Sequence, residues 1–400
     1  MRVRPAQRAH HRSRRGLSRR QARTGQRRPI SRCDQRRSRP RSGGSRQDRL
    51  VGRAGLRGSS RKPRQTARGS SGGAAVVTVS LEPQVDRLRR TLRRPGDALP
   101  RASIGAVPIL WNNVDQPDLA TRVDATTVLD EIARTGYEGT QLGNGFPRGV
   151  ALREMLAERA LRLAEVYVSL PCSVDGPGDD ALDVGRERLA LLHEGGGEVL
   201  TLALAGSPDR SVASGRAADP GTPRLDDAAW QRLGVLVERI AREAVAAGHS
   251  VSFHQHSGTF VETPEELDRL LAVTDPALLG ICLDVAHWTV GGGDPAEALR
   301  RYGDRVRQVH LKDVDADVLA ELRGGRLADF DAAIRARLFT ELGAGVLALP
   351  AVLGALAQRD YAGWLMVEQD SCWGPPAESA AIGRRVLAQE LRRLGDDHPA

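Results

Sequence analysis

Lysine is almost absent from this chain, which has only Lys62 and Lys312 among its 59 basic residues. The other 57 are arginines, and alanine and glycine are abundant, a composition that a GC-rich coding sequence produces. Lys312 is therefore the only ammonium side chain among residues 81–400. A buried lysine can donate a proton near neutral pH, whereas an arginine stays charged. Lys312 is thus a candidate acid–base group, although a plain salt bridge with Asp313 would explain it equally well.

Paired cysteines and long apolar runs are also missing. The four cysteines, Cys33, Cys172, Cys282 and Cys372, lie far apart and form no C-x-x-C pair. This spacing indicates reduced thiols and a cytoplasmic protein. The sequence has no run of about 18 apolar residues, so it predicts no membrane-spanning helix, and its N-terminus lacks the apolar core of a secretory signal.

Acidic and apolar residues are scarce in the first 80 positions. Residues 1–80 contain 24 of the 59 basic residues but only two acids, Asp34 and Asp48, and so carry a net charge of +22. Residues 81–400 carry the remaining −13, so the overall charge of +9 describes neither part. A segment of this composition cannot bury a core, and we expect residues 1–95 to form a disordered basic extension.

The function of this extension has several interpretations. It could be a nucleic-acid-binding tail, a transit peptide or a patch that binds an anionic membrane surface. Alternatively, the start codon is assigned too far upstream and non-coding sequence is translated. The extension has neither an amphipathic period nor interleaved aromatic residues, which argues against nucleic-acid binding and favours the last interpretation. We then expect deletion of residues 1–95 to leave folding and activity unchanged.

From residue 102 onward, apolar runs of strand length alternate with segments of helical periodicity. The predicted strands cover residues 104–110, 136–142, 163–170, 198–204, 250–254, 279–284, 306–311 and 363–368. The predicted helices cover residues 125–135, 153–161, 180–193, 226–247, 264–273, 295–302, 350–358 and 378–394. Eight such pairs over about 300 residues favour a single (β/α)8 TIM barrel at 102–395, and no G-x-G-x-x-G follows the first strand.

Two connections, residues 205–225 and 313–349, are too long to be simple turns. Both leave the carboxyl end of a predicted strand, where long loops shape pockets. We expect the second to close over a bound molecule as a lid.

Polar residues collect where the later strands end, which is where parallel α/β folds build their sites. The preferred metal ligands are His254, Asp284, His310 and Glu368, one from each of strands five to eight. Imidazole and carboxylate ligands without a thiolate suit Mn2+, Co2+, Mg2+ or Zn2+. For one histidine alone, a buried hydrogen-bonded imidazole is the simpler explanation. Four histidines at consecutive strand ends, each with a carboxylate neighbour, favour a metal.

Further candidates flank these ligands. His256 and His287 are the second histidines of their segments, and either could orient a ligand or bind a substrate. The candidates for substrate binding lie at or just after the ends of predicted strands: Gln141, Asn144, His287, Trp111 and Asp313. Aromatic side chains there suit the C–H faces of a polyol ring but also suit packing.

Six stretches carry motifs that can be compared with known families. They are residues 106–113, 139–147, 254–263, 283–287, 309–313 and 363–370. Asp-x-x-His and His-Leu-Lys-Asp resemble motifs found across the xylose-isomerase-like barrel superfamily of sugar isomerases and epimerases. His-x-His-x-Gly-Thr and Val-Glu-Gln-Asp are narrower and resemble the myo-inosose-2 dehydratases. The resemblance covers about residues 103–395.

The resemblance implies an activity and a cofactor. It implies a lyase of inositol catabolism that removes water from a cyclic keto-polyol such as 2-keto-myo-inositol, through an enolate. It places a divalent cation, Mn2+ or Co2+ in preference to Mg2+ or Zn2+, at the four ligands above. The candidates for acid and base are Lys312, His256 and Glu262, in an order that the sequence leaves open. His254 stands where the sugar epimerases have a glutamate, which argues against a two-base epimerase.

The chain also departs from the family pattern. Gln141 replaces a glutamate, residues 284–287 read Asp-Val-Ala-His in place of Asp-Thr-Gly-His, and residues 343–348 lose two acids. A related polyol substrate therefore stays open, as do two alternative functions: a sugar isomerase or epimerase that uses the same enolate, and a sugar-binding barrel without turnover. We expect a small polyol or keto-sugar as partner, no membrane or nucleic acid, and leave a homo-oligomer open.

Overall fold

The computed structural model describes residues 88–89, 92–93, 97–119, 122–370 and 373–397. The interpretations offered for residues 1–87 lie outside these residues. In the described part, no helix is both long enough and apolar enough to cross a membrane. The two cysteines found there, Cys172 and Cys282, are free thiols.

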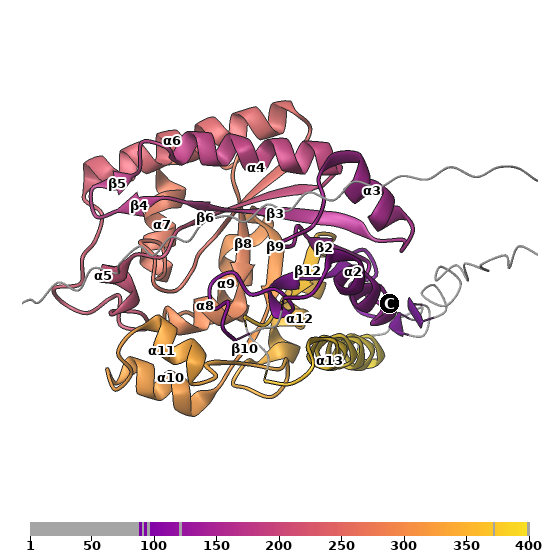
Figure 1. Ribbon diagram of the computed structural model, residues 1–400. Helices are drawn as coiled ribbons and strands as arrows, with labels where there is room; N and C mark the ends of the chain where they lie inside the picture. Colours follow the sequence, from indigo (N-terminus) through magenta and orange to yellow (C-terminus); the bar gives the residue numbers. More distant parts are fainter. Residues whose placement is uncertain (1–87, 90–91, 94–96, 120–121, 371–372, 398–400) are drawn as a thin grey trace, which may run out of the picture. The chain divides into compact units, whose positions relative to one another are not determined.

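Eight parallel strands close into a barrel, which confirms the predicted (β/α)8 fold (Figure 1). The strands are β1 (Ser103–Ala106), β2 (Gly139–Gln141), β3 (Arg162–Leu170), β6 (Val199–Leu204), β7 (Ser250–His254), β8 (Gly280–Asp284), β9 (Val306–Leu311) and β12 (Trp364–Val367). Their order around the barrel is β1-β12-β9-β8-β7-β6-β3-β2, so consecutive barrel strands are neighbours and β12 closes onto β1. Strands β6, β8 and β12 are buried along their whole length, as expected for short apolar runs covered by helices.

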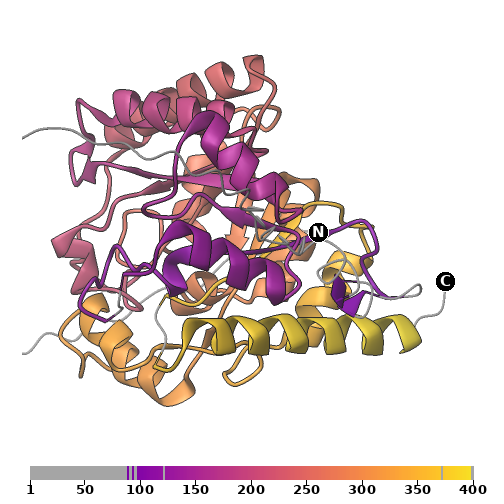
Figure 2. The same cartoon turned by 45° about the vertical axis from the view of Figure 1, so that its right-hand side comes forward.

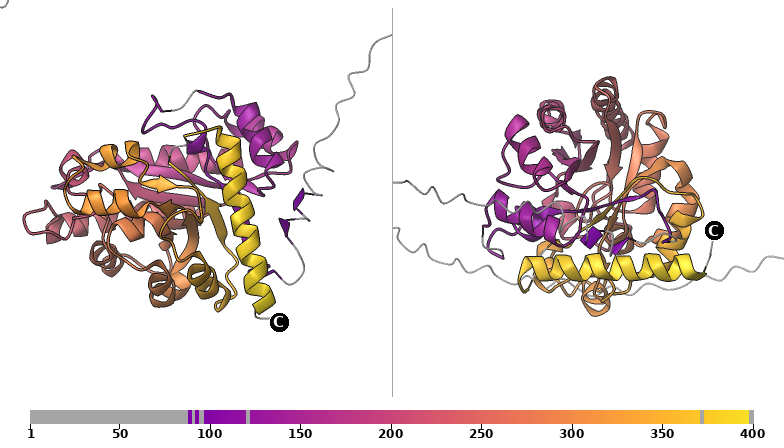
Figure 3. Two further views of the ribbon diagram at one scale, coloured as in Figure 1. Left: turned by 90° about the horizontal axis from the view of Figure 1, so that it is seen from below. Right: turned by 90° about the vertical axis from the view of Figure 1, so that its right-hand side faces the viewer.

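The barrel helices follow the strands and cover them from outside (Figures 1 and 2). They are α2 (Ala125–Arg134), α3 (Gly149–Ala157), α4 (Ala181–Gly195), α6 (Asp227–Ala246), α7 (Pro264–Ala272), α9 (Pro295–Tyr302), α12 (Leu349–Ala357) and α13 (Pro376–Asp397). Figure 3 shows the long α13 running along one side of the barrel, where it contacts α12 and α2.

Local sequence explains where several helices begin. Asp226 and Asp294 are N-caps whose carboxylates accept hydrogen bonds from backbone N–H groups of the first turn of α6 and α9. Thr263 and Glu266 form a capping box at the start of α7. Each cap satisfies N–H groups that the helix itself leaves unpaired.

Several predicted boundaries were wrong by three or four residues, among them the end of the first strand, the start of the second and both ends of the second helix. The first strand ends at Ala106 rather than at residue 110, because Pro108 begins a 3-10 helix, Pro108–Leu110, and has no N–H for the sheet. Helix α3 begins at Gly149, four residues before the predicted start at 153.

The two long connections contain regular structure, which the sequence reading did not predict. A short helix, α5 (Pro208–Ser211), lies in the first connection. The second contains β10 (Asp313–Val314), α10 (Ala316–Arg323), α11 (Phe330–Arg335) and β11 (Phe339–Thr340), and β10 pairs with β11. A small antiparallel pair, β4 (Cys172–Ser173) and β5 (Gly176–Pro177), follows β3, and a 3-10 turn, Gly303–Arg305, precedes β9. Helix α8 (Val285–Val290), directly after β8, was also missed.

Two arginines that precede residue 95 contact the barrel. Arg89 donates hydrogen bonds to the carbonyl oxygens of Tyr137 and Ala160, and Arg93 donates to that of Leu99. These bonds involve charged donors, each contributing about 1.5–3 kcal/mol at most.

We therefore revise the expected effect of truncation. Deletion of residues 1–95 removes Arg89 and Arg93 and should lower the melting temperature by about 5 °C. Deletion of residues 1–87 keeps both arginines and serves as the matched control, with no expected change. Thermal unfolding followed by circular dichroism measures both. Equal melting temperatures for the two truncations would show that the contacts contribute nothing.

Candidate metal centre

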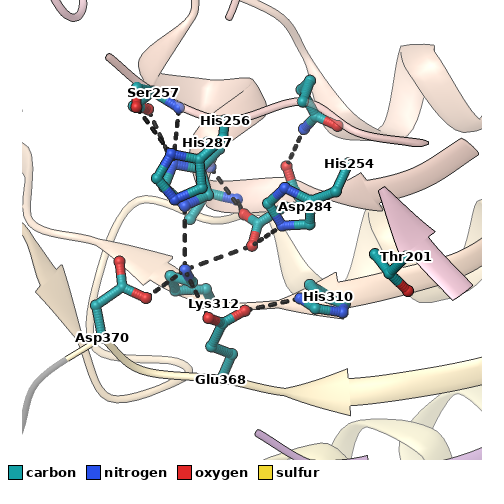
Figure 4. Close-up of polar contacts among 12 residues, drawn as sticks. Thr201, His254, His256, Ser257, Asp284, His287, His310, Lys312, Glu368 and Asp370 are labelled. Atoms are coloured by element: carbon teal, nitrogen blue, oxygen red, sulfur yellow. Dashed lines mark hydrogen bonds and ion pairs between the residues drawn. The ribbon is translucent and has the colours of Figure 1, made fainter. Parts of the chain in front are cut away.

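Four neighbouring strands bring the predicted metal ligands together. His254 ends β7, Asp284 ends β8, His310 lies in β9 and Glu368 follows β12. Asp284 pairs with His310 in the sheet register, and β12 lies beside β9. One ligand atom from each residue lies within 4.8 Å of the others. The barrel thus gathers two imidazoles and two carboxylates at the carboxyl ends of its strands (Figure 4).

The two oxygens of Asp284 have different tasks. Oδ1 accepts hydrogen bonds from the backbone N–H of Ala286, at 2.9 Å, and of His287, at 2.8 Å, and so caps α8. Oδ2 is buried and accepts no hydrogen bond; it lies 3.4 Å from Nε2 of His254 and 3.5 Å from Nζ of Lys312. The cap fixes the carboxylate, and Oδ2 remains available as a ligand atom.

His310 lies between two carboxylates. Its Nδ1 is 2.7 Å from Oε2 of Glu368, and its Nε2 is 3.0 Å from Oε1 of Glu165. Burial alone would lower the pKa of His310, but Cys282 and Glu165 raise it well above its ordinary value. Burial raises the pKa of Glu368, but Lys312 and His310 lower it to about 2. These two side chains therefore form a buried charged pair.

Lys312 is the central cation of the site. Its Nζ donates to Oδ1 of Asp370 at 2.6 Å and lies 3.4 Å from Oε1 of Glu368. Burial lowers the pKa of Lys312, but Asp284, Asp370 and Glu368 together raise it above its ordinary value. The sequence suggested that Lys312 is either an acid–base group or one half of a salt bridge with Asp313. A salt bridge is present, but its partner is Asp370 rather than Asp313.

Two histidines stack beside Lys312. The rings of His256 and His287 lie 3.8 Å apart between centroids. His287 Nδ1 lies 2.9 Å from Ser257 Oγ, and its Nε2 lies 3.2 Å from the Lys312 ammonium. An ammonium only donates, so Nε2 of His287 faces a donor, and Nδ1 also accepts from the backbone N–H of Ser257, at 3.3 Å. Burial and then the neighbouring His254 lower the pKa of His256 to about 3, so this ring is neutral.

These residues fit a divalent cation. A set of two imidazoles and two carboxylates neutralises a double positive charge and is typical of Mn2+, Co2+ and Zn2+ sites. Asp284 Oδ2 is a buried acceptor without a hydrogen bond, which a cation would satisfy. Glu165 behind His310 matches the carboxylate that commonly orients a metal-binding histidine.

A cavity of about 920 Å³ opens above this cluster. His254, His256, Glu368 and Asp370 belong to its wall, and so do the predicted Gln141 and Asn144. The amide oxygen of Gln141 is buried and has no hydrogen-bond partner. Other parts of the wall come from the loops after β1, β6 and β9, including Asp115, Ser207 and Phe330. The volume is ample for a single sugar or polyol ring.

Three predicted site residues lie away from the cavity: Trp111, Asp313 and Glu262. Four others belong to the buried cluster but not to the cavity wall: Asp284, His287, His310 and Lys312. Trp111 is buried and donates from Nε1 to Glu131. The carboxylate of Asp313 accepts from the backbone N–H of Val314, Gly343 and Leu347, and so holds the turn before α12.

Glu262 has a similar structural environment. Its two oxygens accept from the backbone N–H groups of Gly215 and Gly258, which joins the connection after β6 to the loop after β7. Burial raises the pKa of Glu262 to about 7. Both carboxylate oxygens thus bind backbone rather than face the cavity.

The sequence reading gave no role to three residues of the site. Asp370 binds Lys312 and lines the cavity, and burial raises its pKa to about 8. Tyr167 lines the cavity with its ring edge-on to His254, at 5.6 Å between centroids. Glu165 lies beneath His310. An acid within the apolar run 162–170 was the signal that could have identified Glu165.

An exposed ion pair joins two loops at the cavity mouth. Arg335 of α11 donates to both oxygens of Asp118, at 2.8 and 3.0 Å. Near Asp118 in the sequence, Val114 and Asp115 line the cavity. Near Arg335, Asp331 and Ile334 line it. The pair therefore connects the expected lid segment to the loop after β1.

We predict that Asp118→Ala loosens this segment. Cleavage within 313–349 in limited proteolysis should become faster, and the KM for substrate should rise by about two- to fivefold, since one exposed pair contributes little. Arg393→Ala, which breaks an exposed pair within α13, is the matched control. Equal cleavage rates in both variants would show that the Arg335–Asp118 pair does not hold the segment 313–349 in place.

Comparison with known proteins places the chain in a family. Residues 129–390 match the model of the xylose isomerase-like TIM barrel family. The chain belongs to this family. An inosose dehydratase from Geobacillus kaustophilus (strain HTA426) is 33% identical over 294 residues, which cover 73% of this chain and 95% of that protein. An inosose dehydratase from Clostridium botulinum (strain Alaska E43 / Type E3) is 30% identical, with coverages of 72% and 97%.

Two solved structures share the fold. An L-ribulose 3-epimerase superposes with a TM-score of 0.56 at 17% identity and covers 74% of this chain and 96% of its own. A probable 3-DHS dehydratase from Bacillus anthracis superposes with a TM-score of 0.53 at 14% identity, with coverages of 71% and 98%. At such identities the likeness concerns the fold alone.

Proposed function

We propose that this lyase removes water from a cyclic keto-polyol such as 2-keto-myo-inositol, with the help of a divalent cation held by His254, Asp284, His310 and Glu368. The observation that carries the proposal is the cluster of four ligand atoms within 4.8 Å at the base of the cavity. The relatives named inosose dehydratase support the substrate class, and their matches cover nearly all of their own length. The donor set suits Mn2+ or Co2+, with Mg2+ and Zn2+ as alternatives.

Dehydration next to a ketone needs a base for the α-proton and an acid for the β-hydroxyl. His256 and Asp370 both line the cavity, but a pKa of about 3 makes His256 a weak base. Burial raises the pKa of Asp370 to about 8, which suits a general base near neutral pH. We therefore assign proton abstraction to Asp370 and a substrate-binding task to His256.

Lys312 is the proton donor in this proposal. When bound, a divalent cation supplies Lewis-acid stabilisation of the substrate's ketone oxygen and neutralises two of the carboxylates that raise the pKa of Lys312. Asp370 takes the proton from the α-carbon, and the C–H electron pair forms the enolate. The enolate then expels the β-hydroxyl, which takes a proton from Lys312 and leaves as water. His287, which accepts from Lys312, holds the ammonium in place.

The decisive experiment is a dehydration assay on 2-keto-myo-inositol with purified protein. Chelator-treated protein should be inactive, and Mn2+ or Co2+ should restore formation of the conjugated product, followed by its ultraviolet absorbance. Formation of an epimer or a ketose isomer instead would identify an isomerase. Binding of the polyol without turnover, at any metal concentration, would identify a sugar-binding barrel.

A further inference from the structure

Beneath the metal ligands, the barrel interior contains a buried polar network. Its members are Glu165 of β3, Thr201 of β6, Ser252 of β7 and Gln308 of β9, and all four side chains are fully buried. Strands β3 and β9 are separated by three other strands in the barrel order, so the contact between Glu165 and Gln308 crosses the interior. TIM-barrel interiors are mostly filled by branched apolar side chains, so a carboxylate here calls for an explanation.

The network fixes the Glu165 carboxylate. Oε2 accepts from Thr201 Oγ1 at 2.6 Å and from Gln308 Nε2 at 2.7 Å. Ser252 donates to Gln308 Oε1 at 3.2 Å, which holds the amide with its nitrogen toward Glu165. With Oε2 held in this way, Oε1 is directed at His310 Nε2, 3.0 Å away. Three side chains, those of Thr201, Gln308 and Ser252, thus fix the Glu165 carboxylate directly or through one another.

Oε1 of Glu165 is buried and has no hydrogen-bond partner, and a carboxylate can only accept, so a hydrogen on His310 Nε2 is what would satisfy it. In a neutral His310 with its hydrogen on Nε2, the lone pair is on Nδ1. Nδ1 is the nitrogen on the side of Glu368, 2.7 Å from its Oε2. A cation held by His310 and Glu368 would satisfy the lone pair on Nδ1 and Oε2 of Glu368 together. The opposite tautomer would leave two acceptors, His310 Nε2 and Glu165 Oε1, against each other in a buried site, which is costly.

We infer that Glu165 is a positioning residue, which holds His310 in the orientation and tautomer that present Nδ1 to a divalent cation. This inference rests on the proposed metal dependence. Thr201 and Gln308 act through Glu165. None of the three belongs to the cavity wall, so their effect on a substrate is indirect.

The test is Glu165→Gln, an isosteric change. A glutamine that keeps the bonds to Thr201 and Gln308 through its oxygen points an N–H at His310 Nε2, which favours the tautomer with hydrogen on Nδ1. Affinity for Mn2+, measured by calorimetry on the chelator-treated full chain, should fall about 10- to 100-fold. In the Zn2+-loaded parent protein, NMR should show a downfield His310 Nε2–H resonance, which should shift upfield or vanish in the variant.

Two further variants keep the inference falsifiable. Glu262→Gln alters another buried carboxylate, one that binds only backbone N–H groups, and should leave Mn2+ affinity unchanged. Thr201→Val removes one bond to Glu165 but keeps the carboxylate, and should lower the affinity by about two- to tenfold. It decides the matter if Glu165→Gln fails to fold.

The outcomes separate this inference from the proposed function. Parent protein without affinity for Mn2+ overturns the proposed metal dependence, and the inference with it. If the parent protein binds Mn2+ and Glu165→Gln binds it equally well, the inference alone is overturned. The same holds for Thr201→Val where Glu165→Gln does not fold. A fall in melting temperature without a change in affinity or in the His310 resonance would likewise make the network purely structural.

Discussion

Asp284→Asn is expected to abolish metal retention and to lower kcat/KM by about 10³-fold, because it removes one of two charged ligands and several kcal/mol of charge stabilisation. Asparagine keeps an oxygen in the place of Oδ1, which caps α8 through the N–H groups of Ala286 and His287. It replaces Oδ2, the atom with no hydrogen bond, by an amide nitrogen. The fold should therefore survive. Elemental analysis measures the metal content, and circular dichroism checks the fold.

Asp294→Ala is the matched control for this prediction. Asp294 caps α9 in the same manner, by accepting from the N–H of Glu297, and lies outside the cavity wall. Its loss should cost about 1 kcal/mol of stability and leave the metal content unchanged. Full metal content in Asp284→Asn would contradict the site, and so would a parent protein that takes up no metal from Mn2+ solution.

Lys312→Met is expected to lower kcat by about 10²- to 10⁴-fold while the protein keeps its metal. The ammonium lies within 3.5 Å of Asp284, Glu368 and Asp370, so it competes with a cation for two of these carboxylates. Its removal should leave the affinity for Mn2+ unchanged or raise it. The metal-free variant should be less stable, because three buried carboxylates lose their cation. Steady-state kinetics and calorimetry test the two effects separately.

Lys312→Arg separates charge from proton donation. Arginine keeps the positive charge among the three carboxylates but cannot release a proton near neutral pH. It should restore stability without restoring kcat. A near-normal kcat in either Lys312→Met or Lys312→Arg would exclude Lys312 as the acid. Loss of metal from Lys312→Met would instead show that Lys312 helps to hold the site together.

The fold was largely predictable because its signals are local. Most barrel strands are short apolar runs, several of the helices beside them begin at a side-chain cap, and all eight strands were placed within about four residues. The exceptions are also local. Helix α8 was missed because Val285–Val290 continues the apolar run of β8, and its only start signal, Asp284, also ends the strand. Asp284 is at once a strand end, an N-cap and a candidate ligand. The sequence prediction recognised its first and third roles and missed the N-cap.

The candidate ligands were predictable for a related reason. A residue at the carboxyl end of a parallel strand must lie at one rim of the barrel, whatever the details of packing. Position in the chain therefore indicated His254, Asp284, His310 and Glu368 as a group. The same argument failed for Trp111, which follows the first strand but turns into the core beside Glu131.

Pairing between side chains was decided only by the tertiary structure. Lys312 binds Asp370, which follows the neighbouring strand β12, and not its sequence neighbour Asp313, whose carboxylate accepts from backbone N–H groups. Successive residues in extended chain point in opposite directions, so neighbours in sequence rarely share a site.

The sequence by itself thus determined the barrel, its strand ends and the group of residues that gather there, because periodicity, caps and strand length depend on residues close together in the chain. Only the tertiary structure decided that Glu165 lies beneath His310 and that Glu262 binds backbone rather than the cavity. Such contacts join strands and loops that closure of the barrel brings together, and no local pattern encodes which buried polar groups then satisfy one another.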